Sequence, residues 1–80
     1  MPIRSIGVIH DHRRVPVAVM DLSPFVQPPR ALQDLDARPE DRRAIAMARA
    51  ILERGDVDAD ALNRDHPLPA PYRFAAFEDA

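Results

Sequence analysis

Two short apolar runs rich in β-branched residues open the chain. Residues 3–9 (IRSIGVI) and 15–20 (VPVAVM) are separated by the five polar residues 10–14. Runs of this kind, joined by a polar segment without a tight-turn dipeptide, predict a β-hairpin with a longer loop. Proline cannot donate to a ladder, so Pro16 predicts that the second strand lies at an edge or is unpaired at that position.

Each predicted strand should present one apolar face, because successive side chains of a strand point to opposite sides. On the first strand this face holds Ile6 and Val8. On the second strand it holds Val15, Val17 and Val19. A two-stranded hairpin is only marginally stable alone, so we expect it to pack on a helix, on a second copy of itself or on the sheet of a partner.

The strongest helical pattern covers residues 39–54. Proline suits the first helical position, where Pro39 stands, and Gly55 is placed to end the helix. Before this helix, residues 21–30 carry three prolines and predict an extended, polyproline-like crossover. Between the two segments, residues 31–37 are expected to form a turn or two of helix.

The apolar residues of the main helix recur at helical spacing and form one stripe. They are Ala44, Ile45, Ala48, Ile51 and Leu52. This stripe either completes the core of the chain or docks on a helix of a partner, and the pattern does not separate the two. Further along, Asp58 is placed to cap a second, short helical turn.

Most of the aromatic side chains stand at the C-terminal end, after a ladder of prolines. Of the four aromatic residues, Tyr72, Phe74 and Phe77 lie in the last nine positions. Large rings at a chain end are favourable mainly when buried, either on the same chain or in a pocket of a partner, and both alternatives stay open. If a partner is bound, the candidate contact residues are Ile51, Leu52, Leu68, Tyr72, Arg73, Phe74 and Phe77.

Taken together, these patterns predict a small α+β protein. It should have an N-terminal β-hairpin, a proline-rich crossover, one main helix at about 39–54 and an extended C-terminal tail. A chain of 80 residues has room for one small domain, expected at residues 1–66, with residues 67–80 as a proline- and aromatic-rich tail. Domains of this size are marginally stable unless stapled or bound, and the chain has no cysteine for a disulfide.

Charge and hydropathy narrow the classes of function. The formal net charge of −2 at pH 7 argues against a nucleic-acid partner held by bulk electrostatics. No apolar run approaches the roughly 18 residues of a membrane span, and the N-terminus lacks the apolar stretch of a secretory signal. We therefore expect a cytoplasmic protein that does not bind membranes.

Candidate chemistry is sparse. His10 and His12, with His66 from far along the chain, offer three imidazoles for a metal ion, but their spacing matches no familiar ligand set. The serines Ser5 and Ser23 have no matching histidine and acid. We predict a protein without cofactor, metal or enzymatic activity, and keep a metal-binding or sensory role of the His10/His12 loop as the alternative.

Two fragments resemble pieces of the prevent-host-death (Phd/YefM-type) antitoxins. Residues 12–20 (HRRVPVAVM) are similar to the strand-turn-strand segment of that family, where a basic turn precedes Pro-Val-Ala and an apolar strand. The charged helix at 39–54 is similar to the helix that meets the toxin, and residues 67–69 with 76–78 are similar to the acidic-aromatic tails of some members. The resemblance implies toxin binding by the C-terminal half. The family's DNA-binding N-terminal helix has no counterpart before this hairpin, so DNA binding is not implied.

A second resemblance is to the N-terminal segment of fumarylacetoacetate-hydrolase-type enzymes. There a hairpin ending in Asp-Leu-Ser leads through a helix to a proline-rich linker, as residues 21–23 and 67–69 do here. In those enzymes the catalytic domain and its metal carboxylates lie further along the chain, so the resemblance implies no catalysis by this segment.

We therefore predict a small non-catalytic protein-binding module of the antitoxin, inhibitor or accessory-subunit kind. It would engage a larger protein, such as a toxin or an enzyme, through its helix and residues 67–78, and a homodimer through the hairpin is compatible with this function. The second alternative is a small dimeric DNA-binding regulator.

Overall fold

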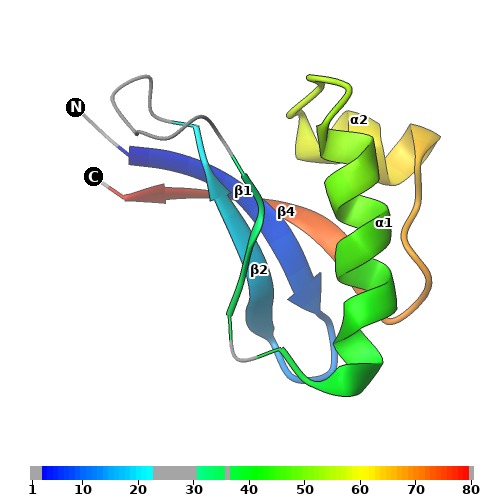
Figure 1. Ribbon diagram of the computed structural model, residues 1–80. Helices are drawn as coiled ribbons and strands as arrows, with labels where there is room; N and C mark the ends of the chain where they lie inside the picture. Colours follow the sequence, from blue (N-terminus) through cyan, green and yellow to red (C-terminus); the bar gives the residue numbers. More distant parts are fainter. Residues whose placement is uncertain (1–2, 23–30, 36, 80) are drawn as a thin grey trace.

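A four-stranded antiparallel sheet and two helices make up the computed structural model of the protein, which describes residues 3–22, 31–35 and 37–79 (Figure 1). The strand order is β3-β2-β1-β4. Along the chain the elements are β1 (Ile3–His10), β2 (Val15–Asp21), β3 (Gln33–Asp34), the 3-10 turn η1 (Pro39–Asp41), α1 (Arg42–Leu52), α2 (Ala59–Asp65) and β4 (Tyr72–Asp79). The predicted α+β class, N-terminal hairpin and main helix are confirmed.

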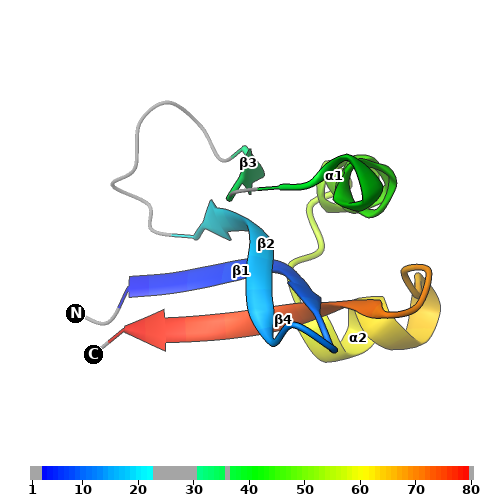
Figure 2. The same cartoon turned by 90° about the horizontal axis from the view of Figure 1, so that it is seen from below.

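Both helices lie on the same side of the sheet, as Figures 1 and 2 show. The hydrophobic core lies between the two layers. The sheet contributes Ile6, Val8, Val17, Ala18, Met20 and Phe74 to it, and the helices contribute Ile45, Ala48, Leu52, Ala59 and Leu62. In the part of the chain that the structure describes, no helix covers the opposite face of the sheet (Figure 2).

The apolar stripe of the main helix faces this core. Ala44, Ile45, Ala48 and Leu52 are buried, and Ile51 is partly buried. Of the two alternatives for the stripe, the structure therefore shows the first, packing within the same chain. Burial of the stripe fixes α1 on the sheet.

The two strands of the hairpin are not in continuous register. Pro16 stands opposite Ile9 and Ala18 stands opposite Val8, so that Val17 is an extra residue in β2. Such a β-bulge interrupts the alternation of side chains between the two faces of a strand.

The bulge makes one prediction about β2 wrong. Val15, Val17 and Val19 were expected to share one face, but Val19 stands opposite Gly7, on the side of the sheet away from the core. Val15 stands opposite His10, on the helix-covered side, and is 45% exposed. After Val17 the core positions shift by one residue, to Ala18 and Met20, and both are buried. A strict period of two cannot continue through an inserted residue.

A short strand replaces the helical turn that was expected within residues 31–37. β3 pairs only with Ala18 and Val19 of β2, which leaves Pro16 beyond its end. Arg49 of α1 holds the segment in place, because its guanidinium donates to the carbonyl of Leu32 at 3.3 Å and to Asp34 at 3.2 Å. The expected polyproline-like crossover lies mostly at residues 23–30, outside the described residues.

The predicted C-terminal tail is an edge strand of the same sheet. β4 pairs with β1 along its whole length, from Tyr72 opposite His10 to Asp79 opposite Ile3. Both edges of β1 are therefore paired, and a second copy cannot add a strand there. The peptide bond between Ala70 and Pro71, just before β4, is cis.

The ends of the helices follow from local chemistry. The Asp58 side chain caps α2 by accepting from the backbone N–H groups of Asp60 and Ala61, as predicted for this residue. Gly55 follows α1 with φ at +96°, a conformation that favours glycine, and its N–H donates to the Leu52 carbonyl at 3.1 Å.

Candidate functional site

Three of the seven predicted contact residues belong to the chain's own core. Leu52 is 6% exposed, Leu68 is 8% exposed and Phe74 is fully buried. These side chains cannot reach a partner while the fold is intact. Ile51 is partly buried against the same core.

Arg73 and Phe77 lie on the opposite face of the sheet. In the register of β1 with β4, Arg73 stands beside Ile9 and Phe77 beside Ser5, and these positions alternate with the core positions. We call this side of the sheet the open face. It comprises the side chains of Ser5, Ile9, Pro16, Val19, Asp21, Arg73, Ala75 and Phe77, with Gly7 among them.

The centre of the open face is apolar and slightly hollowed. Ile9, Arg73 and Phe77 take part in two shallow hollows there, one bordered by Pro16 and the other by α2. Ile9, Val19 and Phe77 are partly exposed. The face therefore offers apolar surface without being a deep cavity.

Gly7 permits a close approach at the middle of this face. A Cβ atom at this position would lie 2.3 Å from the carbonyl oxygen of Ala18 and 3.2 Å from the Phe77 ring. The absence of a side chain lets the bulged strand approach β1, and it lets the Phe77 ring lie across β1.

An ion pair marks the end of the open face next to the hairpin turn. The Arg73 Nε donates to the Asp11 carboxylate at 2.6 Å, and both side chains are about half exposed. Exposed pairs of this kind contribute little to stability, because solvent screens them. Both charges therefore remain accessible at the rim of the face.

A buried carboxylate fixes the start of β4. Asp41, at the end of η1, is fully buried and accepts from the Arg13 guanidinium, from the Tyr72 hydroxyl and from the backbone N–H of Arg38, the last at 2.9 Å. These donors come from the hairpin turn, from β4 and from the residue before η1. One side chain thus joins three segments that are distant in sequence.

The donors around Asp41 keep it ionised. Burial is the largest single influence on the pKa of Asp41 and acts to raise it. The hydrogen bonds from Arg13, Tyr72 and the Arg38 N–H, with the charge of Arg13, outweigh burial and lower this pKa from 3.8 to about 2. Burial and the bond to Asp41 raise the pKa of Tyr72, which stays a neutral donor. With its oxygens engaged by its own chain, this carboxylate stabilises the fold.

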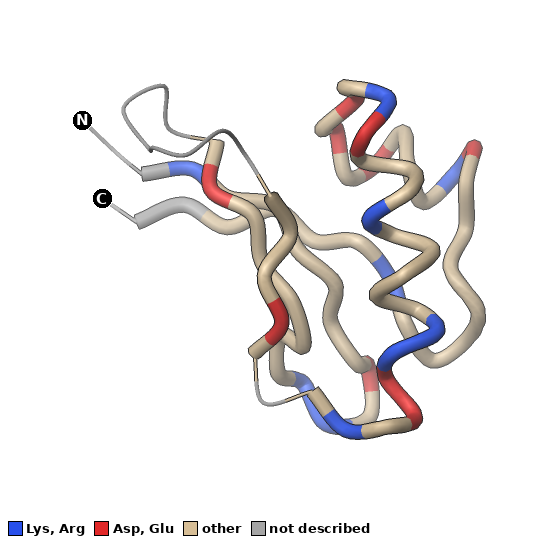
Figure 3. Tube along the Cα trace, in the orientation of Figure 1, with Lys and Arg blue, Asp and Glu red and all other residues tan. Residues whose placement is uncertain are grey.

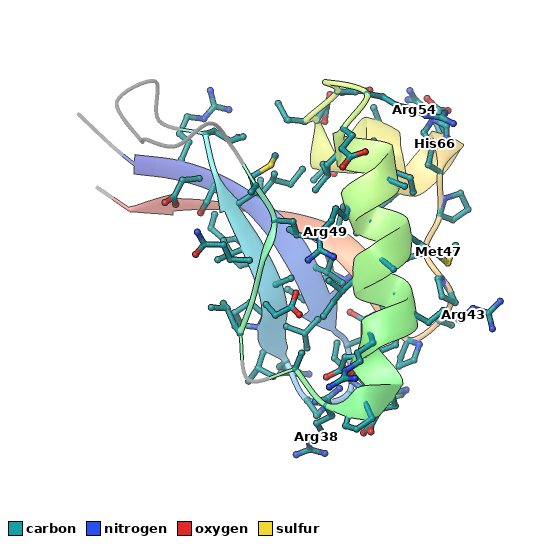
Figure 4. The ribbon with its side chains drawn as sticks, in the orientation of Figure 1. Arg38, Arg43, Met47, Arg49, Arg54 and His66 are labelled. Atoms are coloured by element: carbon teal, nitrogen blue, oxygen red, sulfur yellow. The ribbon has the colours of Figure 1, made fainter. Side chains whose placement is uncertain are left out.

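The histidines of the hairpin pack on neighbouring rings. His10 accepts a hydrogen bond at Nδ1 from the Arg13 N–H at 3.2 Å, and its ring meets Tyr72 edge-on at 5.0 Å between centroids. His12 lies 5.7 Å from His10 in a similar arrangement. His66 follows α2 at the other end of the molecule (Figure 4). Within residues 3–22, 31–35 and 37–79, no group of three or more His, Asp or Glu residues is placed to hold a metal ion.

Asn63 of α2 closes part of the free edge of β4. Its side-chain amide donates to the Phe74 carbonyl at 2.9 Å and accepts from the Phe74 N–H at 2.8 Å. Sequence reasoning missed Asn63, which no local pattern distinguishes. Asp41 was not singled out either: it falls in the first turn of the predicted helix, where an acid is commonly explained by the helix dipole.

Charges are divided between the two ends of the molecule (Figure 3). Among the described residues, the end with the hairpin turn and the start of α1 holds Arg13, Arg14, Arg38, Arg42, Arg43 and Arg73 with Asp11, Glu40 and Asp41. The end with the α1–α2 connection holds Glu53, Arg54, Asp56, Asp58, Asp60, Arg64 and Asp65. The first end is therefore net positive and the second net negative.

Among the described helices, neither is long and apolar enough to cross a membrane. Comparisons of the chain with protein-family models, with curated proteins and with solved structures found no match. The resemblance to prevent-host-death antitoxins therefore remains a prediction.

Proposed function

We propose that this chain is a small non-catalytic protein-binding module that holds a larger protein on the open face of its sheet. One observation carries the proposal: both helices cover the same face, so the strands present Ile9, Val19 and Phe77 to solvent on the other. A sheet with one covered face and one apolar, partly exposed face is well suited to bind a second surface.

The residue types on this face fit an interface. Aromatic and arginine side chains contribute much of the binding energy at protein contacts, and Phe77 and Arg73 line the same two hollows here. The strands beneath them are fixed by the core, so little order has to be gained on binding. This proposal retains Arg73 and Phe77 from the predicted contact residues. It omits Leu52, Leu68 and Phe74, which the core buries, and Ile51 and Tyr72, which are partly buried against it.

The kind of partner is proposed from the small size of the module and from its resemblance to prevent-host-death antitoxins. A chain this small, with an interface of its own, suits an inhibitor, an accessory subunit or an antitoxin. The resemblance to prevent-host-death antitoxins supports a toxin as one such partner.

The test compares capture of proteins by the tagged chain and by two variants from the native cells. Phe77→Asp places a charge on the open face, whereas Met47→Asp places the same charge on the outer side of α1, where Met47 is 37% exposed (Figure 4). We expect a stoichiometric partner with the unaltered chain and with Met47→Asp, and at least about a tenfold loss with Phe77→Asp, because a buried unpaired charge is costly.

Circular dichroism and thermal unfolding of both variants provide the folding control. Retention of the partner by a folded Phe77→Asp variant would show that the open face is not the binding surface. Equal loss in both variants would show that the effect is one of net charge and not of position.

A further inference from the structure

We propose a second binding surface, a groove at the free edge of β2 that takes an extended, acidic and apolar peptide segment of a protein. The groove runs between the start of β2 and the side chains of Leu35 and Arg38. It is lined by Arg13, Val15, Pro16, Val17, Leu35 and Arg38. It meets the open face only at Pro16, which borders hollows on both sides.

The floor of the groove consists of apolar side chains that are exposed to solvent. Among the described residues, three large apolar side chains are classed as exposed, namely Val15 at 45%, Leu35 at 38% and Met47 at 37%. Two of the three lie together in this groove, although the stretches of chain that carry them are distant in sequence. An apolar side chain of a peptide placed there would cover surface that the chain leaves in water.

The walls of the groove carry positive charge. The Arg38 backbone is fixed by its bond to Asp41, while its side chain is 61% exposed and points away from the body of the protein (Figure 4). Within the part of the chain that the structure describes, its ion-pair partner is Glu40 at 4.0 Å, a distance at which an exposed pair is weak. Arg13 is paired with Asp41 and still has further N–H donors. Of the two arginines that line the groove, Arg38 is thus the freer to bind an anion.

The charge around the groove is opposite in sign to that of the whole chain. Of the residues that the structure describes at this end of the molecule, six arginines, Arg73 included, stand against three carboxylates, whereas the formal net charge of the chain is −2. Complementary charge favours an acidic occupant and increases its rate of association.

The uncovered strand edge favours an extended occupant. β3 pairs only with Ala18 and Val19, and the Leu35 N–H takes the carbonyl of Val17 at 2.9 Å. Pro16 has no N–H to donate to an added strand, so side chains must supply most of the recognition. In an extended peptide, alternate side chains project to the same side, so a carboxylate can pair with Arg38 while an apolar neighbour covers Val15 and Leu35.

The lining distinguishes a peptide from a nucleic acid. Single-stranded nucleic acids are held by aromatic platforms on which bases stack, together with cations for the phosphates. Among the described residues, the groove lining holds no aromatic side chain, and its floor is aliphatic. Its chemistry matches carboxylates interspersed with apolar side chains.

The test is an NMR titration of the purified full chain with two synthetic peptides. One alternates aspartate with leucine over five residues, and the other alternates asparagine with leucine. We expect saturable amide shifts at Val15, Val17, Leu35 and Arg38 with the aspartate peptide, and at least about fivefold weaker binding of the asparagine peptide.

Two charge-reversed variants provide matched controls. Arg38→Glu should weaken binding of the aspartate peptide at least about tenfold, whereas Arg54→Glu, an exposed arginine at the other end of the molecule, should change it less than about twofold. Phe77→Asp should leave the titration unchanged, so this experiment and the capture on the open face can fail independently.

Four results would overturn the proposal. The first is no saturable shift at the groove, and the second is equal binding of the two peptides. The third is equal weakening by Arg38→Glu and Arg54→Glu. The fourth is occupation of the groove by something else, either an oligonucleotide that displaces the peptide or a second copy of the chain, seen as concentration-dependent shifts without peptide.

Discussion

The two faces of the sheet use the same strand in different ways. On β4, Phe74 is fully buried under the helices, whereas Phe77, three residues later, lies partly exposed on the open face. Alternation along one strand thus gives one ring to the core and the other to the surface. The role of each aromatic residue is therefore determined by the face of the strand on which it lies, and not by how close it is to the end of the chain.

The largest difference should appear when each ring is removed. Phe74→Ala should lower the free energy of unfolding by about 4 kcal/mol, because it leaves a cavity in the core. Phe77→Ala should cost at most about 1 kcal/mol, because the ring is already partly hydrated. Urea unfolding of both variants measures the difference. Similar losses would mean that the open face contributes to stability as much as the covered one.

A smaller effect on the free energy of unfolding is expected from removing the buried charge of Asp41. Asp41→Asn should cost about 3 kcal/mol near pH 7, because Arg13 and Tyr72 lose a charged acceptor. Since the folded pKa of Asp41 is lowered to about 2, its contribution is present above pH 4 and is lost as the pH falls from about 4 toward 2.

Thermal unfolding between pH 2 and pH 7 tests this contribution of Asp41. The unaltered chain should lose stability on acidification faster than Asp41→Asn, so that the difference between them narrows toward pH 2. A difference that stays constant over this range would show that the charge on Asp41 is not what stabilises the fold.

The smallest effect on the free energy of unfolding is expected at Gly7, where β2 approaches β1 closely. Gly7→Ala should cost about 2 kcal/mol, because the new methyl group would collide with the backbone oxygen of Ala18. Gly55→Ala is the matched control. It meets no atom within 4 Å and is strained only by its positive φ, so it should cost about 1 kcal/mol. Chemical unfolding gives both values, and a smaller cost for Gly7→Ala than for Gly55→Ala would contradict the close approach.

Local patterns were sufficient for the elements that depend on neighbours in sequence. The hairpin, the main helix and the Asp58 cap each follow from a few adjacent residues. The pairing of β4 with β1 is different in kind, since Arg73 and Asp11 bond across 62 positions of sequence. The alternation of Tyr72, Phe74 and Ala76 with Arg73, Ala75 and Phe77 was a strand signal, but the prolines before it favoured an extended tail.

The candidate site was predicted only in part, because it too depends on pairing between segments that are distant in sequence. Spacing at a chain end identified Arg73 and Phe77 together with Phe74, but only the partner strand determines which side of the sheet each one faces. The β-bulge at Val17 is likewise invisible in sequence, because it depends on which residue of β1 stands opposite. Asp41 and Asn63 act through contacts between distant segments, which a reading along the chain does not reach.

The Asn63 amide has a consequence for how the protein behaves in a crowded solution. An unpaired strand edge is a template on which other chains can assemble into fibrils. By donating to and accepting from Phe74, this one side chain occupies the place that an invading strand would take. The pairing of an invading strand is thereby hindered at Phe74, and a leucine of similar size at position 63, which can neither donate nor accept, would leave these backbone groups open.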